Sequence, residues 1–558
     1  MIQTAIAAGA LLAQDPATPI TYAVTIADTG ERPTVSVELR LTGEEDGTTR
    51  LRIPAFWGGQ SDLWNVIDGL TVDGGEWTET GDPGFRDVAH MPRAALTIRY
   101  RVIPDRTGAP HAGPHDYYRP YIEPDFVHLI GHTWLIAPES ADGDSPVALR
   151  IDYPDGWVFA SDLEHGELTL SSVGPSITVA GDYRIETRGV GGANVRVAQR
   201  GDTGIPDDIF AEAIDTAILA NFDYWQAEGQ PYLVTVLPLE ADPGHMSIGG
   251  TNLGDSFAMF VTAGPDLSIL TRILAHEHTH SWVPDRLGGA LPGDQYDEAE
   301  GYWFSEGFTD FLTTRAGVRG GSFDATTAIA HLNEVMAQDA ASPWRDAPNS
   351  VIREQFWTDA EAQRLPYHRG ELFAALVDHE IRIATSGAQD LDDVITAMAE
   401  TRDNGAAPAR FADVVLETTG VDVSGLVERH IVNGEPVFLA ADTFGACGPV
   451  ETSDEPVFDY GMTGSRNEAG QFVIEEVDED GPAWPAGFRP GMTILERLEG
   501  SVGDASVDSV LRVESEDGIQ DLRYRPTNGE IRRTQRIVPS ASGDMPAACQ
   551  ARLAGEGA

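Results

Sequence analysis

Three histidines and a glutamate lie within five consecutive positions of the segment RILAHEHTHSWV, residues 272–283. His276 and His280 are four residues apart, and Glu277 follows the first of them. On an α-helix this spacing brings both imidazoles to one face, one turn apart, which suits two zinc–nitrogen bonds. Glu277 would then stand beside the metal, where it can take a proton from a water that zinc activates. His278 faces away from both ligands, so we expect it to be a surface or packing residue.

A catalytic zinc site needs a third protein ligand and an open position for water. Glu300 lies in the acidic stretch DQYDEAEG, where a solvated carboxylate is the ordinary interpretation. Glu306 lies in GYWFSEGFTDF, whose aromatic residues would exclude water, and it is the preferred ligand. Asp310 follows one helical turn later and would accept an N–H from one of the ligating histidines.

The elements that must position these residues can be predicted from the spacing of apolar side chains. Residues 20–200 contain short segments rich in Val, Ile, Thr and Tyr between Gly, Asp and Pro turns, which is typical of an all-β sandwich. The apolar run LSILTRILA leads a predicted helix into the histidine motif, and Pro284 is the predicted stop. Residues 320–435 are mostly helical in pattern, and strands return from about residue 445. The sequence therefore predicts a multidomain α+β protein.

The composition excludes several classes of function. The chain has 558 residues and a formal net charge of −52, with the acidic residues spread along the sequence. Such an acidic protein repels nucleic acid and anionic lipid, so we expect neither as a partner. All 37 basic residues are arginines, which excludes lysine chemistry such as a Schiff base or a P-loop. The sequence has no run of about 18 apolar residues, which a membrane-spanning helix would need.

Two features favour export. Residues 1–14 resemble the end of a secretory signal peptide without its positively charged start, and a disordered or mis-started N-terminus is the alternative. Cys447 and Cys549 flank one C-terminal module. They would join its ends by a disulfide in an exported protein, or stay as two thiols in the cytoplasm. We therefore expect a periplasmic or extracellular location, with the cytoplasm as the alternative.

The stretches HEHTHSW and WFSEGFTD together resemble the glycyl aminopeptidase family of zinc peptidases, which are gluzincins like thermolysin. The resemblance implies one zinc ion per chain, held by His276, His280 and Glu306, with Glu277 as the general base. It also implies a tyrosine that donates a hydrogen bond to the oxyanion of the tetrahedral intermediate. LPYHRGELF supplies Tyr367 at that position, with arginine where the family has lysine; the neighbouring His368 is an alternative donor.

The same resemblance implies an order of domains. An N-terminal β-sandwich would occupy residues 15–200, and a thermolysin-like catalytic domain residues 201–320. A helical domain over 321–440 would complete the active site, followed by a PDZ-like domain over 441–558. The segment GPAWPAGFRPGMTI resembles bacterial PDZ domains, although Met492 replaces the usual aspartate. This module would either bind a peptide at a sheet edge or only pack against the catalytic core.

One position departs from the family's pattern. The family has a Gly-Gly-x-Glu-His stretch whose glutamate would hold the α-ammonium group of the substrate. HMSIGGTNLGDSF supplies Gly249 and Gly250, but Asn252 stands where the glutamate should be. A neutral amide lacks the charge that makes such a contact strong. Asp255 is a candidate substitute for the missing carboxylate.

The leading hypothesis is a zinc metallopeptidase, an aminopeptidase that releases small N-terminal residues such as Gly or Ala. Asn252 motivates one alternative, an endopeptidase or oligopeptidase that acts on longer or N-blocked peptides. A non-catalytic peptide-binding or scaffold protein is the alternative from another class. Its structural zinc would need a fourth protein ligand, and no cysteine lies near the motif.

Overall fold

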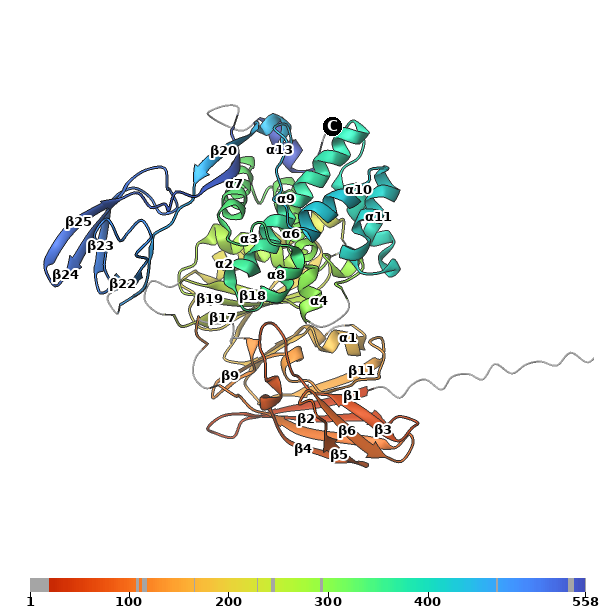
Figure 1. Cartoon of the computed structure of the whole chain (residues 1–558). Helices are drawn as coiled ribbons and strands as arrows, with labels where there is room; N and C mark the ends of the chain where they lie inside the picture. The colour runs from red at the N-terminus through yellow and green to blue at the C-terminus, as the bar shows by residue number, and fades with distance from the viewer. Residues whose placement is uncertain are drawn as a thin grey trace, which may run out of the picture.

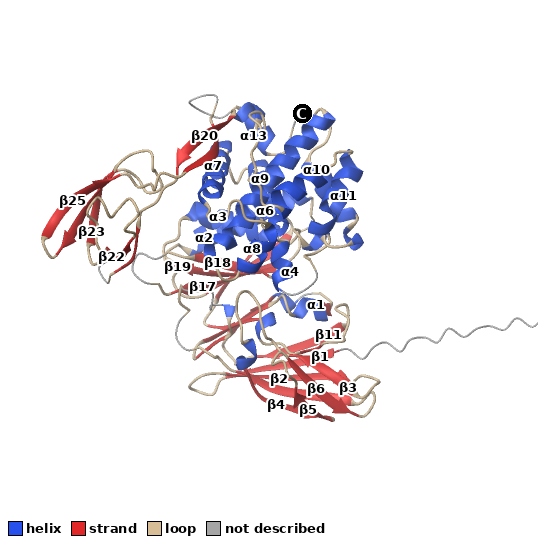
Figure 2. Ribbon diagram, viewed as in Figure 1, coloured by secondary structure: helices blue, strands red, loops and turns tan. Residues whose placement is uncertain are grey.

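The computed structural model shows a β-rich N-terminal part, a central sheet covered by helices, and a separate C-terminal sheet (Figures 1 and 2). The residues that the structure describes are 20–106, 110–112, 118–164, 166–227, 229–241, 246–291, 295–467, 470–539 and 546–556. The segment interpreted as the remnant of a signal peptide, residues 1–14, lies outside this range.

The N-terminal part is built from short strands, several of which alternate buried and more exposed side chains, whereas Phe126–Ile130 and Ile177–Gly181 are buried throughout. The strands are β1 (Ile20–Ala27), β2 (Thr34–Thr42), β3 (Thr48–Arg52), β4 (Ile67–Asp73), β5 (Gly75–Glu79), β6 (Phe85–His90), β7 (Ala95–Val102), β8 (Tyr121–Glu123), β9 (Phe126–Ile130), β10 (Ala137–Pro138), β11 (Pro146–Asp152), β12 (Val158–Ser161), β13 (Leu168–Thr169) and β14 (Ile177–Gly181), with the short helix α1 (Leu170–Val173). Sheets with strand orders β13-β11-β1-β2-β7-β4 and β10-β3-β6-β5 share one core, which includes Tyr22, Leu39, Leu51 and Val88. Two sheets that share a core in this way form a sandwich.

A central sheet lies between this part and the helices. Its strands are β15 (Arg184–Val190), β16 (Ala193–Gln199), β17 (Tyr232–Leu239), β18 (Ile248–Asn252) and β19 (Ser256–Thr262), in the order β15-β16-β17-β19-β18. Because β17 and β19 are covered on both faces, they are continuous apolar runs. One face packs on a further sheet, β12-β14-β9-β8, and the other on helices. Strands β15 and β16 belong to this sheet, which therefore extends to the N-terminal side of the boundary predicted at residue 200.

Helices cover the other face of the central sheet and continue beyond it (Figure 2). They are α2 (Asp207–Trp225), α3 (Leu267–Thr279), α4 (Gln295–Glu300), α5 (Tyr302–Ser305), α6 (Gly307–Gly320), α7 (Ala325–Ala341), α8 (Asn349–Gln355), α9 (Ala360–Thr385), α10 (Leu391–Glu400), α11 (Ala407–Thr419), α12 (Ser424–Leu426) and α13 (Ala547–Leu553). Helix α3 ends at Thr279, before the predicted stop at Pro284. A proline restricts the residue before it to extended conformations, and tighter bonds such as Trp282 N–H to Thr279 C=O replace the helical ladder.

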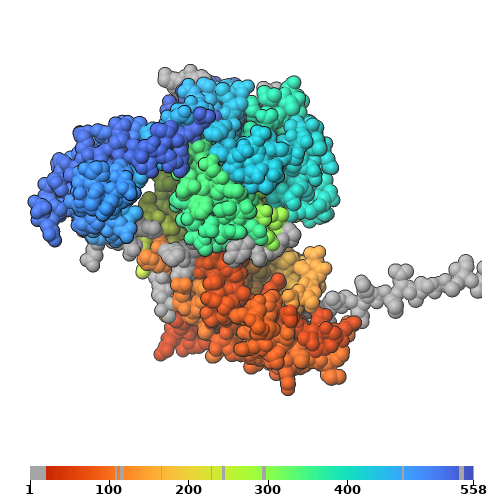
Figure 3. Space-filling view, in the orientation of Figure 1, coloured from red at the N-terminus to blue at the C-terminus, as the bar shows by residue number. Residues whose placement is uncertain are grey.

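The C-terminal segment is divided between two parts of the molecule. Its strands are β20 (Val450–Pro456), β21 (Met462–Arg466), β22 (Phe472–Val477), β23 (Thr493–Glu499), β24 (Ser509–Ser515), β25 (Gly518–Tyr524) and β26 (Ile531–Ile537). The sheet β21-β22-β23-β24-β25 has its own small core and projects from the body (Figures 1 and 3). Both ends of the segment return to the helical core, where the disulfide Cys447–Cys549 joins them. Among the described residues, every helix is too short or too polar to span a bilayer.

Candidate metal centre

Helix α3 delivers two histidines to the floor of a cavity. Its N-terminus is capped by the Asp266 carboxylate, which accepts hydrogen bonds from two backbone N–H groups of the first turn. Leu270 and Leu274 are buried in the main core and fix the rotation of the helix. His276 lies in its last turn and His280 directly after it, so the four-residue spacing brings both rings together.

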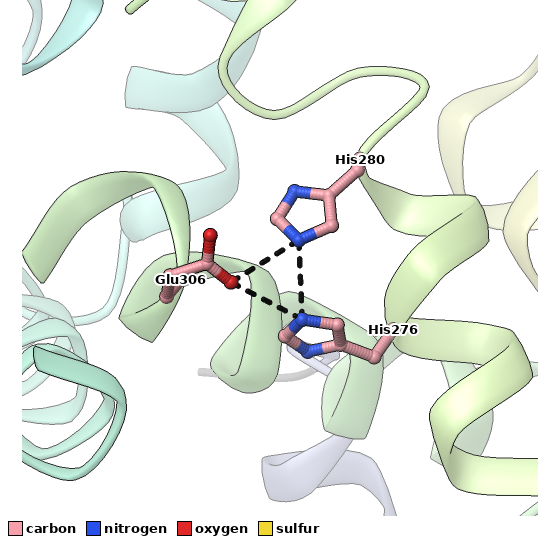
Figure 4. A group of neighbouring side chains, drawn as sticks. All are labelled: His276, His280 and Glu306. Carbon is pink, nitrogen blue, oxygen red and sulfur yellow. Dashed lines mark hydrogen bonds and ion pairs between the residues drawn. The ribbon is translucent and has the colours of Figure 1, made fainter. Parts of the chain in front are cut away.

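The two histidines and Glu306 form a compact group of possible metal ligands (Figure 4). The Nε2 atoms of His276 and His280 are 3.1 Å apart. Oε2 of Glu306 lies 3.4 Å from Nε2 of His276 and 3.2 Å from Nε2 of His280. With zinc–ligand bonds of about 2.0–2.1 Å in tetrahedral geometry, ligand atoms would be about 3.3 Å apart. The three atoms therefore have the spacing that a shared zinc ion requires.

The remaining ring nitrogens show which atoms face the metal position. Nδ1 of His276 donates to Oδ1 of Asp310 at 2.9 Å, and Nδ1 of His280 donates to the carbonyl of Val283 at 2.9 Å. Both acceptors are oxygens that only accept, so the protons are on Nδ1 and the lone pairs are on Nε2. Two nitrogen lone pairs and a carboxylate oxygen thus converge on one point. These electron-rich atoms repel one another, and a cation bound between them would attract all three. Two imidazole nitrogens and a carboxylate oxygen are a donor set that fits zinc.

The ionisable groups of the site have shifted pKa values. Burial would lower the pKa of His276, but the carboxylates of Asp310 and Glu306 outweigh it and raise that pKa well above the usual value, so a metal ion would bind at Nε2 in exchange for a proton. Burial would raise the pKa of Glu306, but the two imidazoles lower it to about 2. Glu277 differs: burial raises its pKa, and the histidines offset this only in part. The ligand carboxylate is thus held ionised, while Glu277 is tuned toward accepting a proton.

Two glycines explain how Glu306 and Tyr367 reach one cavity. A Cβ on Gly307 would lie 2.3 Å from Cα of Gly370, and a Cβ on Gly370 would lie 2.0 Å from the carbonyl oxygen of Trp303. Because glycine has no side chain, helices α5 and α6 can cross α9 backbone to backbone at these two positions. Glu306, directly before Gly307, and Tyr367, three residues before Gly370, both line the cavity.

Glu277 and Tyr367 line the same cavity as the metal group, and this cavity has a volume of about 900 Å³. Oε2 of Glu277 accepts the backbone N–H of Asn252 at 2.9 Å. The Tyr367 ring lies nearly parallel to that of His276, with 6.0 Å between centroids. Burial and the nearby carboxylates raise the pKa of Tyr367, so its hydroxyl keeps the proton that a hydrogen-bond donor needs. Among the described residues that line the cavity, His368 is not included.

Strand β18 brings Gly249, Gly250 and Asn252 to the cavity. In the orientation that satisfies its hydrogen bonds, the two N–H groups of the Asn252 amide face three acceptors, the carbonyls of Ser256 and Glu277, each at 3.2 Å, and the Tyr232 hydroxyl at 2.9 Å. The amide is therefore used to attach β18 to its neighbours.

The other residues that the sequence singled out lie away from the metal position. The exposed Asp255 lies 4.0 Å from Arg286 and is not a lining residue of the described cavity. Glu300 lies 3.8 Å from Arg353. His278 is 2% exposed and packs against aromatic rings, which are those of Phe222, Tyr232 and Trp282. It is thus a packing residue, one of the two roles expected for it.

Sequence reasoning missed the aromatic and acidic residues that complete the cavity. The acidic ones are Asp285 and Glu298, and the aromatic ones are Phe56, Trp57, Tyr118, Tyr302, Phe356 and Trp357. The first two aromatics directly precede a Gly-Gly pair, which is a signal for a tight hairpin turn. No spacing rule connects them to a motif more than 200 residues later.

Comparison with known proteins agrees with this geometry. Residues 270–364 match the family model of the M61 glycyl aminopeptidases. The crystal structure of an aminopeptidase N family protein from Idiomarina loihiensis is similar with a TM-score of 0.68 and 16% identity, over 96% of this chain and 100% of that one. An M1 zinc metallopeptidase variant from Deinococcus radiodurans, bound to a Tyr-Ser-Ala substrate, gives a TM-score of 0.50 and 16% identity, over 75% of this chain and 94% of that one. The sequence has no match among curated proteins.

The family match and the fold support a zinc metallopeptidase, and both are consistent with the gluzincin type. The segment that matches the M61 glycyl aminopeptidase model, residues 270–364, carries the two histidines and Glu306. The α+β architecture, with several sheets and a helical region, is that of aminopeptidase-like proteins.

Proposed function

We propose that the protein is an aminopeptidase that hydrolyses the first peptide bond of its substrates with one zinc ion per chain. The observation that carries this proposal is the convergence of two Nε2 lone pairs and the Glu306 carboxylate on one point. Glu277 and Tyr367 lie in the same cavity. A structural zinc site would be closed by a fourth ligand, and the described residues offer a group of three.

The side chains divide the reaction between them. His276, His280 and Glu306 hold the ion, and Asp310 fixes the ring of His276. When bound, zinc supplies Lewis-acid polarisation of the scissile carbonyl and of the attacking water.

Two further residues act on the reacting atoms. Glu277 takes the proton of the attacking water and passes it to the leaving amine, which its raised pKa favours. Tyr367 donates its hydroxyl proton in a hydrogen bond to the developing oxyanion.

One contact supports exopeptidase over endopeptidase action. Within the described residues, β18 is the edge strand of the central sheet, and an extended peptide could pair with such an edge. The Tyr118 hydroxyl, which comes from the N-terminal part, already donates to the carbonyl of Gly250 on β18 at 2.7 Å. An extended substrate that continued past this point would have to displace it. Release of an N-terminal Gly is the preference that the family description suggests, and Ala is the next residue in size.

Several further expectations belong to this proposal. The molecule would consist of a β-sandwich, a thermolysin-like catalytic domain, a helical domain and a PDZ-like domain that offers a peptide site. The buried disulfide Cys447–Cys549 favours an exported protein. The charge of −52 favours peptide substrates over nucleic acid as partners.

The test compares a peptide with its N-acetylated form, using protein loaded with zinc. We expect hydrolysis of the free-amine peptide that a chelator abolishes and zinc restores, with the acetylated peptide cleaved at least about tenfold more slowly. Equal rates on the two peptides would favour endopeptidase action. No zinc-dependent hydrolysis of either peptide would contradict the proposal.

A further inference from the structure

The cavity that holds the metal group is also lined by aromatic side chains from two distant parts of the chain. We call them the aromatic wall, defined as Phe56, Trp57, Tyr118, Tyr302, Phe356 and Trp357. All except Phe356 are only partly buried, so their rings contribute surface to the cavity. The metal-binding group does not require this surface, and the proposed function uses only the Tyr118 hydroxyl and none of the rings.

One half of the wall begins beside a metal ligand. Tyr302 is one helical turn before Glu306, and its carbonyl accepts the N–H of Glu306 at 2.9 Å. The ring of Phe356 packs on that of Tyr302 with centroids 4.5 Å apart, and on that of Trp357 at 4.9 Å. These rings are therefore within reach of a substrate residue that flanks the scissile bond.

The other half is presented by a tight hairpin of the N-terminal part. The backbones of Trp57 and Gln60 exchange hydrogen bonds of 3.0 and 2.9 Å, with only Gly58 and Gly59 between them. Both glycines have positive φ, 55° and 76°, as this turn of a two-residue hairpin demands. The ring of Trp57 packs edge to face with that of Tyr118, with centroids 5.5 Å apart.

The two halves meet across the cavity. The rings of Phe56 and Trp357 contact each other with centroids 5.7 Å apart and an interplanar angle of 78°. A Cβ at Gly59 would lie only 3.4 Å from the Trp357 ring. The wall is therefore continuous from the hairpin of the N-terminal part to the turn before Glu306.

We propose that the aromatic wall is the subsite for a large apolar side chain, aromatic in the best substrates, on one of the two residues that flank the scissile bond. Partly exposed rings at the edge of a cavity gain by packing with another ring, and a methyl group would leave most of that surface in contact with water. This inference rests on the proposed function. It restricts any preference for Gly or Ala to the other side of the scissile bond.

The experiment uses the full-length zinc protein and three tripeptides: Ala-Ala-Ala, Phe-Ala-Ala and Ala-Phe-Ala. We expect kcat/KM for one of the phenylalanine peptides to exceed that for Ala-Ala-Ala about tenfold or more. The ratio should fall to within about threefold in Trp357→Ala and in Phe56→Ala, because each substitution removes one side of the contact that joins the two halves.

The matched control is Tyr153→Ala, which removes a half-exposed ring that stacks on Phe159 at 4.6 Å, outside the cavity. It should keep the wild-type ratio. If Trp357→Ala does not fold, Phe56→Ala in the other half carries the test. A wild-type ratio near one for both peptides, or an undiminished ratio in the folded wall variants, would overturn the inference.

A binding measurement separates this inference from the proposed function. Titration of the zinc form of Glu277→Gln with the same peptides measures the dissociation constants without turnover. If the wild type cleaves no peptide, the proposed function fails, and the ratio of these constants alone decides the role of the wall. A phenylalanine peptide that binds about tenfold more tightly than Ala-Ala-Ala supports it, and equal binding overturns it.

Discussion

The floor and the aromatic wall of the same cavity are built in opposite ways. The floor takes its chemistry from short segments, residues 276–280 and 306–310, whose helical spacing places each ligand. The wall joins residues 56–57 to residues 356–357, about 300 positions away, through contacts between rings. The positions of the metal ligands are thus fixed by local helix geometry. The surface proposed to select a substrate depends instead on how distant parts of the chain pack.

The largest effect is expected from removing the third ligand of the floor. Glu306→Ala leaves two imidazoles without the carboxylate, so the protein should lose its zinc during dialysis and its hydrolytic activity should fall to background. Metal analysis together with a peptide assay measures both.

The control for this variant is Glu300→Ala, which removes a nearby glutamate that lies 3.8 Å from Arg353. It should retain zinc and activity. Loss of zinc in the control but not in Glu306→Ala would mean that the floor has been assigned to the wrong glutamate.

Tyr367→Phe should give the next largest effect, because it removes a donor to the oxyanion without opening the packing. We expect kcat to fall about 10²- to 10³-fold while zinc content is unchanged. Steady-state kinetics on the free-amine peptide gives the result. His368→Asn is the comparison variant and should change kcat by less than about threefold; the reverse pattern would make His368 the donor.

Asp310→Asn tests whether the hydrogen bond from Nδ1 of His276 to Asp310 contributes to zinc binding. Its carboxylate accepts the Nδ1 proton of His276, and a neutral amide would weaken that bond. Zinc affinity should fall about 10- to 100-fold, as measured by competition with a chelating dye. An unchanged affinity would show that the ring of His276 is fixed by packing alone.

The smallest effect on selectivity is expected from Asn252→Ala. Its amide nitrogen faces acceptors on Ser256, Tyr232 and Glu277, which leaves only the neutral Oδ1 as a weak acceptor for the substrate's ammonium group. The ratio of rates on free-amine and acetylated peptides should change less than about twofold, while unfolding free energy falls by about 1–3 kcal/mol. A collapse of the ratio would make Asn252 the amine anchor after all.

The sequence predicted the floor because its information is local. The four-residue spacing of His276 and His280 and the aromatic setting of Glu306 need only helix geometry to be interpreted. The division into a strand-rich beginning and a helical middle also follows from the periodicity of apolar residues. The pairing of β15 and β16 with the central sheet, across the boundary expected at residue 200, was not predicted. Strand partners depend on tertiary contacts, which the periodicity of one segment does not contain.

The wall and the hydrogen-bond partners of Asn252 could not be predicted for a related reason. That Trp57 and Trp357 line one cavity is decided by the packing of two parts of the chain, although the Gly58-Gly59 turn was visible in the sequence. The position of Asn252 in a motif predicts a weak ligand for an amine, and that role stays a prediction because Asn252 lines the cavity. Its actual partners lie on β17, β19 and α3, which one strand cannot reveal.

The most direct test of the account is the zinc content and activity of Glu277→Gln. This substitution keeps the size of the side chain but removes the group that accepts the proton, and it leaves all three ligands in place. We predict about one zinc ion per chain, as in the wild type, and a rate of peptide hydrolysis reduced at least about 10²-fold. Undiminished hydrolysis by the zinc-loaded variant would contradict it.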